Sequence, residues 1–348
     1  MKTLPLGQHK HGACFGRRLR ALVCGGFGLV GVAAWLPLSA QTTLLNDSFP
    51  NGGRGGPGDQ SLPSSAYWYT SGGGSGYSAA PGSLSETGGL SQNFVANFTS
   101  GTGSSQSLNV GDTLTLNFTF GVTVAADTSS GAFSRGFRVG LLNSNGAAFR
   151  DAGLHDSYYD GFTGYFAALN LNTSSLSDNA PIALIKRSAT DGSAPIAPAT
   201  SGHSYLILNN VLGNLGTNGT GTGTSSNPYN IVGIFGGSVT LANQFIDGTT
   251  YTGALTFFRD TTSSITLNLS VNGGTLSGYS TTVSDTTSIF SAFNTIAIGP
   301  ASGVVSTFTL QNASVVYTAV PEPSACALIA GAFALVGAAF FRRRVAVR

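Results

Sequence analysis

The densest group of chemically reactive side chains lies in residues 150–162 and consists of three carboxylates and two phenols: Asp151, Asp156, Asp160, Tyr158 and Tyr159. Carboxylate oxygens are ligands that Ca²⁺ prefers, so the three aspartates form a candidate calcium site. A tyrosine ring offers a flat apolar face with a hydroxyl at its edge, which makes both tyrosines candidate contacts for a sugar ring. The alternative is a solvated turn, in which the aspartates cap the backbone and the aromatic rings pack at the start of a strand.

Trp68 is a second candidate for ligand contact because it stands between two other aromatic residues, Tyr67 and Tyr69. Successive side chains of a strand point to opposite faces, so Trp68 is expected on one face and both tyrosines on the other. At least one of these aromatic faces is then expected at the surface, where it can stack on a sugar. The alternative for Trp68 is packing in the core.

The sequence contains no recognisable set of catalytic residues. Glu86 is the only glutamate before residue 320, and no pair of aspartates stands out as the two carboxylates of a glycosidase. No Gly-x-Ser-x-Gly segment or phosphate-binding glycine-rich loop is found either. All three cysteines fall in the terminal segments, so the region between them has no disulfide or thiol chemistry. The sequence therefore predicts no catalytic residue and, calcium apart, no cofactor.

Charge is unevenly distributed along the 348 residues. Residues 1–40 carry five basic and no acidic side chains, and residues 342–348 carry four arginines. Between them stand 7 basic and 13 acidic residues, which gives 7 − 13 = −6 for the central region. A mildly acidic body argues against nucleic acid as a partner, because phosphate binding needs clustered Lys and Arg.

The N-terminal segment has the pattern of a secretory signal peptide over residues 1–40. A basic stretch is followed by an apolar stretch at 21–36, and Leu38-Ser39-Ala40 supplies a small residue before a cleavage point. We expect signal peptidase to cut after Ala40. The alternative is a retained membrane anchor.

The C-terminal segment, residues 320–348, combines three features in order. These are Val320-Pro321-Glu322-Pro323-Ser324, an apolar run at 325–341 and a basic tail at 342–348. An apolar run of this length is at the short limit for a membrane-spanning helix, and the arginines are expected to stay in the cytoplasm. The physical pattern alone predicts an exported chain tethered by its tail, and a generic tail anchor is the alternative.

The arrangement of residues 320–348 closely resembles the PEP-CTERM sorting domain of Gram-negative bacteria. The resemblance implies that a membrane-embedded exosortase recognises Val320, Pro321, Glu322 and Pro323 and removes the helix. The precursor would be membrane-anchored, and the mature protein would reach the cell surface or the extracellular matrix. In such bacteria this sorting usually accompanies exopolysaccharide production. The resemblance says nothing about residues 41–319.

Residues 41–319 show a hydrophobic period of two, which predicts strands with one buried face. Ten segments have this character: 113–124, 137–142, 162–169, 182–186, 204–209, 231–241, 251–258, 265–271, 293–298 and 304–317. Many strands separated by Gly, Ser and Asn turns predict an all-β fold, an antiparallel β-sandwich or a barrel.

The order of these segments resembles a concanavalin A-like jelly roll, as in lectin and glucanase domains. The resemblance rests on Asn46-Asp47-Ser48-Phe49 near the start, Trp68, a strand after Gly111 and the segment 136–141. It implies that the strand containing Phe308 and Leu310 returns beside the first strand.

Three functions remain open on these grounds. The leading prediction is a non-enzymatic surface or matrix protein associated with extracellular polysaccharide. The first alternative is a polysaccharide hydrolase or lyase that uses Asp and Tyr side chains on the sandwich. The second is a self-assembling coat or adhesin subunit.

Overall fold

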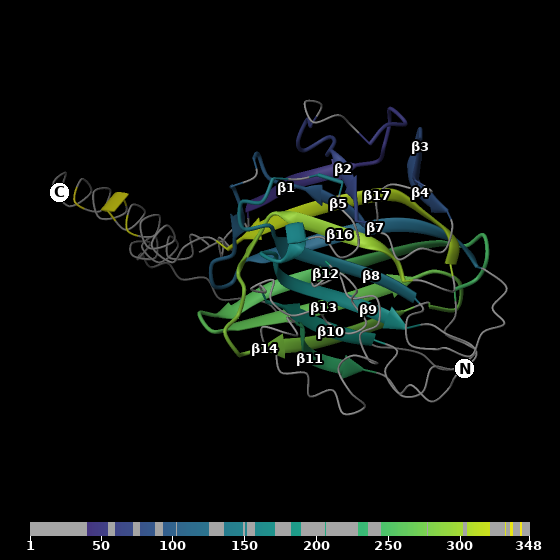
Figure 1. Ribbon diagram of the computed structural model, residues 1–348. Coiled ribbons are helices and arrows are strands. Elements are labelled where there is room, and N and C mark those ends of the chain that lie inside the picture. The colour runs from purple at the N-terminus through teal and green to yellow at the C-terminus, as the bar shows by residue number, and fades with distance from the viewer. Residues whose placement is uncertain are drawn as a thin grey trace, which may run out of the picture. The chain divides into compact units, whose positions relative to one another are not determined.

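The computed structural model describes residues 40–54, 60–71, 77–87, 93–101, 103–124, 136–148, 150–151, 157–170, 182–188, 206, 229–235, 245–276, 278–301 and 305–320, with 331, 335, 336 and 342. Nearly all of the described residues of the segment from 40 to 320 belong to antiparallel strands or to the turns between them (Figure 1). The predicted signal peptide falls outside these residues apart from Ala40, so it stays a prediction.

Most strands belong to two large sheets. The first sheet has eight strands in the order β14 (Tyr279–Asp285), β13 (Ser264–Asn272), β12 (Thr250–Thr261), β7 (Thr113–Val124), β17 (Val305–Ala319), β4 (Ser83–Thr87) and β3 (Tyr77–Ala80), with β1 (Ala40–Asp47) also paired to β17. The second has seven strands in the order β11 (Tyr229–Phe235), β10 (Ile182–Arg187), β9 (Thr163–Asn170), β8 (Gly136–Asn143), β16 (Thr295–Ala301), β5 (Phe94–Asn97) and β2 (Trp68–Thr70).

Smaller elements complete the described fold. Strands β6 (Gln106–Ser107) and β15 (Ala292–Phe293) form a two-stranded sheet, and two short 3₁₀ turns are η2 (Ser157–Tyr159) and η3 (Gly274–Leu276).

The chain crosses repeatedly between the two large sheets. After β7 in the eight-stranded sheet it forms β8 to β11 in the seven-stranded sheet, then returns as β12 to β14, and crosses twice more to make β16 and β17. This is the antiparallel sandwich with jelly-roll connections that the sequence predicts. The return of the last strand is confirmed too, because β17 pairs with β1 over seven residue pairs, from Ala40↔Ala319 to Asp47↔Ala313.

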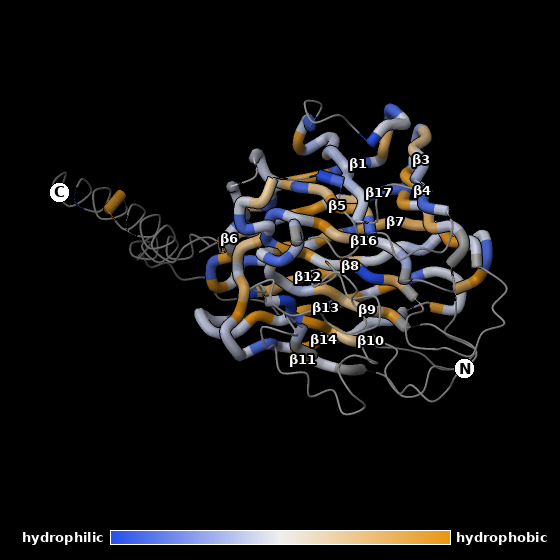
Figure 2. The backbone as a smooth tube through the Cα atoms, viewed as in Figure 1, coloured by the Kyte–Doolittle hydropathy of each residue, from blue (hydrophilic) through white to orange (hydrophobic). Residues whose placement is uncertain are grey.

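The strands form where the sequence alternates. In β13, Ile265, Leu267, Leu269 and Val271 are buried, and the residues between them are half-buried. Each apolar side chain of such a strand faces the opposite sheet, which buries the whole row at once. Figure 2 shows the same alternation of hydrophobic and hydrophilic residues along the central strands.

The centre of the sandwich is an aromatic cluster around Phe120. Its ring stacks on Phe137 of the other sheet at 4.5 Å between centroids, and also contacts Phe308, Tyr251 and Phe245 at 5.3–5.8 Å. Such contacts add to the burial of apolar surface, which has to stabilise a body without disulfides.

The seven-stranded sheet is also buried on its outer face, which the sequence did not predict. Val95, Leu142, Phe166, Ile185 and Ala297 form a second apolar cluster with residues of the loops that cover them. All six residues of β10 are therefore buried, and the hydrophobic pattern there is continuous instead of alternating. Leu206, the one described residue of the predicted strand 204–209, belongs to this cover.

Two further strand predictions differ from the structure in their bounds. The segment 293–298 is interrupted at Asn294, which separates β15 from β16. Strand β11 begins at Tyr229 instead of 231 and its described part ends at Phe235; residues 236–241 lie outside the described residues.

Neighbouring phenylalanines on β12 test this architecture. Phe257 is fully buried between the sheets, whereas Phe258 points outward and is 39% exposed. We expect Phe257→Ala to lower the free energy of unfolding by about 3–5 kcal/mol, because it leaves a cavity in the core. Phe258→Ala should cost about 1 kcal/mol or less. Urea denaturation of both variants measures the difference, and equal losses would contradict the assigned faces.

Candidate functional site

An ion pair between Arg54 and Asp151 joins the two regions in which the sequence places candidate ligand contacts. Arg54 Nη2 lies 2.8 Å from Asp151 Oδ2, and Nη1 donates to Oδ1 at 2.9 Å. The backbone N–H of Thr70, at the end of β2, donates to the same Oδ1 at 3.0 Å. This bidentate contact fixes Asp151 beside the strand that carries Tyr69.

Three tyrosines surround the Arg54 side of this pair. The guanidinium carbon of Arg54 lies 5.2 Å from the ring centroid of Tyr77 and 5.8 Å from that of Tyr67. Tyr67 and Tyr69 meet edge to face at 4.2 Å. All three tyrosines are half-buried, so part of each side chain remains at the surface.

Tyr158 extends the same surface on the Asp151 side. The guanidinium of Arg150 lies 5.3 Å from the Tyr158 ring centroid, and Tyr158 and Tyr69 both pack against the outer apolar cluster. We call this surface the tyrosine patch; it consists of Arg54, Tyr67, Tyr69, Tyr77, Arg150, Asp151 and Tyr158.

The charge states of the patch follow from Asp151 and from partial burial. Burial alone would lower the pKa of Arg54, but the hydrogen bond and the charge of Asp151 outweigh it and raise that pKa. Burial raises the pKa of the Tyr69 hydroxyl, and Tyr67 and Asp151 add to this. Arg54 therefore stays charged and Tyr69 stays neutral at physiological pH.

Trp68 is not a surface residue, so its prediction as a ligand contact is wrong. Its ring is fully buried, and its indole Nε1 donates to Asp47 Oδ2 at 2.9 Å. The same carboxylate accepts the N–H groups of Ala66 and Phe49 at 3.0 and 2.9 Å. The need to satisfy three donors around a buried carboxylate turns Trp68 inward, and alternation then turns Tyr67 and Tyr69 outward.

Tyr159 is also buried, in contrast to its prediction as a sugar contact. It packs in the outer apolar cluster, with only 1% of its surface exposed. The fully buried guanidinium of Arg187 donates to the carbonyls of Tyr159 and Phe162, which holds this turn against the sheet. Of the three predicted aromatic contacts, only Tyr158 thus reaches the surface.

The described residues do not assemble the predicted calcium site. Both oxygens of Asp151 face Arg54, whose positive charge opposes a cation there. Asp160 lies near Arg187, where its charge acts against the lowering of the Arg187 pKa by burial. Asp156 lies outside the described residues, and within them no three His, Cys, Asp or Glu side chains gather as metal ligands.

A buried ion pair that the sequence did not indicate joins the two sheets. Lys186 Nζ lies 3.0 Å from Asp285 Oδ2, and both side chains are 7% exposed. Tyr165 donates its hydroxyl to the same oxygen at 2.8 Å and accepts the N–H of Phe290 at 3.0 Å. Burial raises the pKa of Tyr165 well above its usual value. The carboxylate of Asp285 is thus engaged by three groups, counting the N–H of Thr287.

Asp112 fixes the point at which the C-terminal segment leaves the sandwich. Its carboxylate accepts the hydroxyl of Tyr317 at 2.7 Å and the backbone N–H of Val320 at 3.1 Å. Val320, the first residue of the predicted sorting motif, is 45% exposed. Pro321, Glu322 and Pro323 lie outside the described residues.

Four residues beyond Val320 are described, and all four are helical: Gly331, Leu335, Val336 and Arg342. A search of the described residues finds no helix with the length and apolar character needed to cross a membrane.

Comparisons with known proteins give structural likeness without sequence likeness. No family model and no curated protein sequence matches the chain. Among solved structures, the Emp47p carbohydrate recognition domain is 10% identical, with 79% of this chain and 96% of that chain covered and a TM-score of 0.39. A legume lectin-like domain from Entamoeba histolytica is 13% identical, covering 73% and 90%, with a TM-score of 0.37.

Peanut lectin is 10% identical, with 81% of this chain and 100% of that chain covered and a TM-score of 0.36. The assignment of a jelly-roll sandwich rests on the strand order of this chain itself.

Two aspartates with different surroundings test how the site is held. In Asp47→Asn an amide N–H replaces a carboxylate oxygen, so at least one of three buried donors faces another donor. We expect a loss of about 2 kcal/mol or more in the free energy of unfolding. Asp151→Asn keeps an acceptor for Thr70 and loses only a partly exposed ion pair, which should cost about 1 kcal/mol or less. Urea denaturation compares the two, and the reverse order would refute these roles.

Proposed function

We propose that this protein is an exported, non-enzymatic binder of extracellular polysaccharide and that the tyrosine patch contacts the glycan. The observation that carries the proposal is that Tyr67, Tyr69 and Tyr158 are held in place with part of each side chain at the surface. The Arg54–Asp151 pair and Arg150 hold these rings at the surface, so little ordering is needed when a ligand binds.

The patch has the chemistry that a sugar requires. Sugar rings present apolar C–H faces and a rim of hydroxyls that both donate and accept hydrogen bonds. The half-buried tyrosine rings match the faces, while the hydroxyls of Tyr67 and Tyr69, the guanidinium N–H groups and the Asp151 carboxylate match the rim. The hydroxyls of Tyr77 and Tyr158 are buried, so these two residues offer only their rings.

The surroundings of the buried carboxylates support a non-enzymatic role. Asp47, Asp112 and Asp285 each accept several hydrogen bonds from groups that hold the fold together. A glycosidase needs two carboxyl groups that face the scissile bond. These three aspartates instead belong to structural contacts.

Export and surface location rest on the two terminal segments. A cleaved signal peptide and a PEP-CTERM tail processed by exosortase would deliver the sandwich to the cell surface or the extracellular matrix of a Gram-negative bacterium. Ala40 pairs with Ala319, so both segments join the sandwich at the same end of one strand pair.

Retention on polysaccharide tests the binding role. We expect the full-length protein to co-sediment with an extracellular polysaccharide from a panel of neutral and acidic polymers, without releasing new reducing ends. Tyr67→Ala and Tyr158→Ala should each weaken binding about tenfold, a change of about 1.4 kcal/mol. Phe258→Ala removes an exposed aromatic ring from β12, outside the tyrosine patch, and should leave binding unchanged.

Other results would reject the proposal. Release of reducing ends would establish a hydrolase or a lyase, and retention that is equally strong in both tyrosine variants would exclude the patch. Absence of retention on every polymer would exclude polysaccharide binding.

Replacement of the motif tests sorting separately. We expect the combined substitutions Pro321→Ala, Glu322→Ala and Pro323→Ala to abolish tail removal, so that the longer precursor accumulates in the membrane fraction. Immunoblots of cell fractions measure this. Unchanged size and location would show that the tail is a generic anchor.

A further inference from the structure

The described surface also has a pocket that shares no residue with the tyrosine patch. It has a volume of about 360 Å³ and is bordered by β1, the turn at 61–65 and the loop between β5 and β6. Its lining residues are all uncharged: Thr43, Leu44, Leu62, Pro63, Phe98, Thr99, Ser100, Ser104, Ser105 and Gln106. This volume falls within the range of about 300–1,000 Å³ typical of small-molecule sites.

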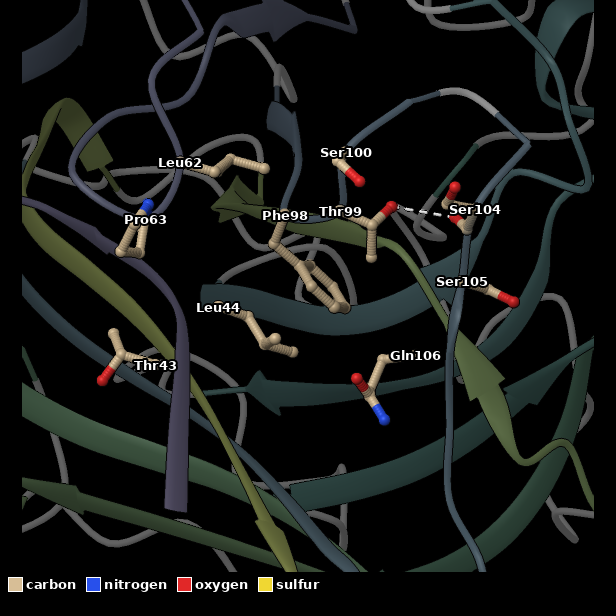
Figure 3. Close-up of a pocket in the computed structure, with 10 residues that line it drawn as sticks. All are labelled: Thr43, Leu44, Leu62, Pro63, Phe98, Thr99, Ser100, Ser104, Ser105 and Gln106. Carbon is tan, nitrogen blue, oxygen red and sulfur yellow. Dashed lines mark hydrogen bonds between the residues drawn. The ribbon is translucent and has the colours of Figure 1, made fainter. Parts of the chain in front are cut away.

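The pocket has an apolar floor and a polar side. Figure 3 shows Leu44 and the Phe98 ring near its middle, with Ser104, Ser105 and Gln106 along one side. The exposed hydroxyls of Ser100 and Ser105 make no hydrogen bond within the described part of the chain. Gln106 donates through Nε2 to the carbonyl of Ser107, which leaves its Oε1 able to accept.

Two asparagines hold the polar side in position. Asn97 Oδ1 accepts the N–H of Thr99 at 2.8 Å, and its Nδ2 donates to the carbonyl of Gly101 at 3.2 Å. The Nδ2 of the buried Asn294 donates to the carbonyl of Ser104 at 3.1 Å. Thr99 closes the loop by donating its hydroxyl to the same carbonyl at 2.8 Å. A loop fixed in this way loses little conformational entropy when a ligand binds.

We infer that this pocket binds one neutral sugar unit, an inference that deepens the proposed function and rests on it. The C–H face of the sugar would lie on Leu44 and Leu62, beside the buried ring of Phe98, and its hydroxyls would meet Ser100, Ser105 and Gln106. The described lining residues offer no cation to balance a carboxylate, sulfate or phosphate. An anionic sugar gains no ion pair there and loses part of its hydration, so the pocket favours uncharged sugars.

Titration with small glycosides tests the inference on the full-length protein. The probes are the methyl glycosides of glucose, galactose and mannose, with methyl glucuronide as the anionic comparison, followed by ligand-observed NMR. We expect at least one neutral glycoside to bind, and the glucuronide to bind about tenfold more weakly than that glycoside, because its carboxylate finds no cation among the lining residues.

Variants locate the binding. Ser105→Trp should fill the pocket and abolish binding, whereas Ser64→Trp places the same ring on an exposed residue next to the lining residue Pro63 and should have no effect. Ser100→Ala with Ser105→Ala removes two hydroxyls without adding bulk and should weaken binding about tenfold. The double alanine variant decides the matter if the tryptophan variant fails to fold.

The outcomes separate this inference from the proposed function. The pocket assignment is refuted if no neutral glycoside binds, if Ser105→Trp folds and binds normally, or if the glucuronide binds as tightly as the neutral glycosides. Polysaccharide retention that depends on Tyr67 and Tyr158 would still support the proposed function in those cases. Glycoside binding at the pocket without any effect of the tyrosine variants would support the pocket and refute the role of the patch.

Discussion

The stack of Phe120 on Phe137, with ring centroids 4.5 Å apart, joins the two sheets at the centre of a body that contains no cysteine. The inner faces of both sheets meet around that contact, within one continuous apolar core. With the inner face of the seven-stranded sheet fixed in this way, its outer face can carry a second apolar cluster. Tyr69 and Tyr158 of the tyrosine patch rest on this cluster, so the proposed glycan surface is supported by the core through one intervening sheet.

One buried carboxylate positions both proposed binding surfaces. Asp47 accepts the N–H of Ala66 and the indole N–H of Trp68, which fixes residues 66–68 against the end of β1. Successive side chains point to opposite faces here, so Tyr67 and Tyr69 point away from the core and form part of the tyrosine patch. On the other side of the same segment, Pro63 lines the neutral pocket, and its carbonyl accepts the N–H of Asn46. A substitution at Asp47 is therefore expected to disturb both surfaces.

Charge is scarce in this protein, and several of its charged side chains connect separate elements of the fold. Lys186 and Asp285 connect the sheets, Arg187 holds the turn at Tyr159, and Arg54 fixes Asp151. Buried pairs are screened by salt much less than exposed ones. The sequence is otherwise rich in hydroxyl side chains, and the residues that line the pocket offer uncharged hydrogen-bonding groups.

The sequence by itself determined strands such as β7 and β13, because their period of two is a local alternation, whereas β3, β4, β5 and β14 were not among the ten predicted segments. It also determined that Trp68 and its two neighbouring tyrosines face opposite ways. Only the tertiary structure decided which face is buried, since that depends on Asp47, 21 residues before Trp68. Arg54, the partner of Asp151, is 97 residues away in the chain, and no local sequence pattern predicts this pairing. The continuous burial of β10 likewise needs a cover supplied by distant loops, and the pocket exists only where β1 meets the loop at 98–106.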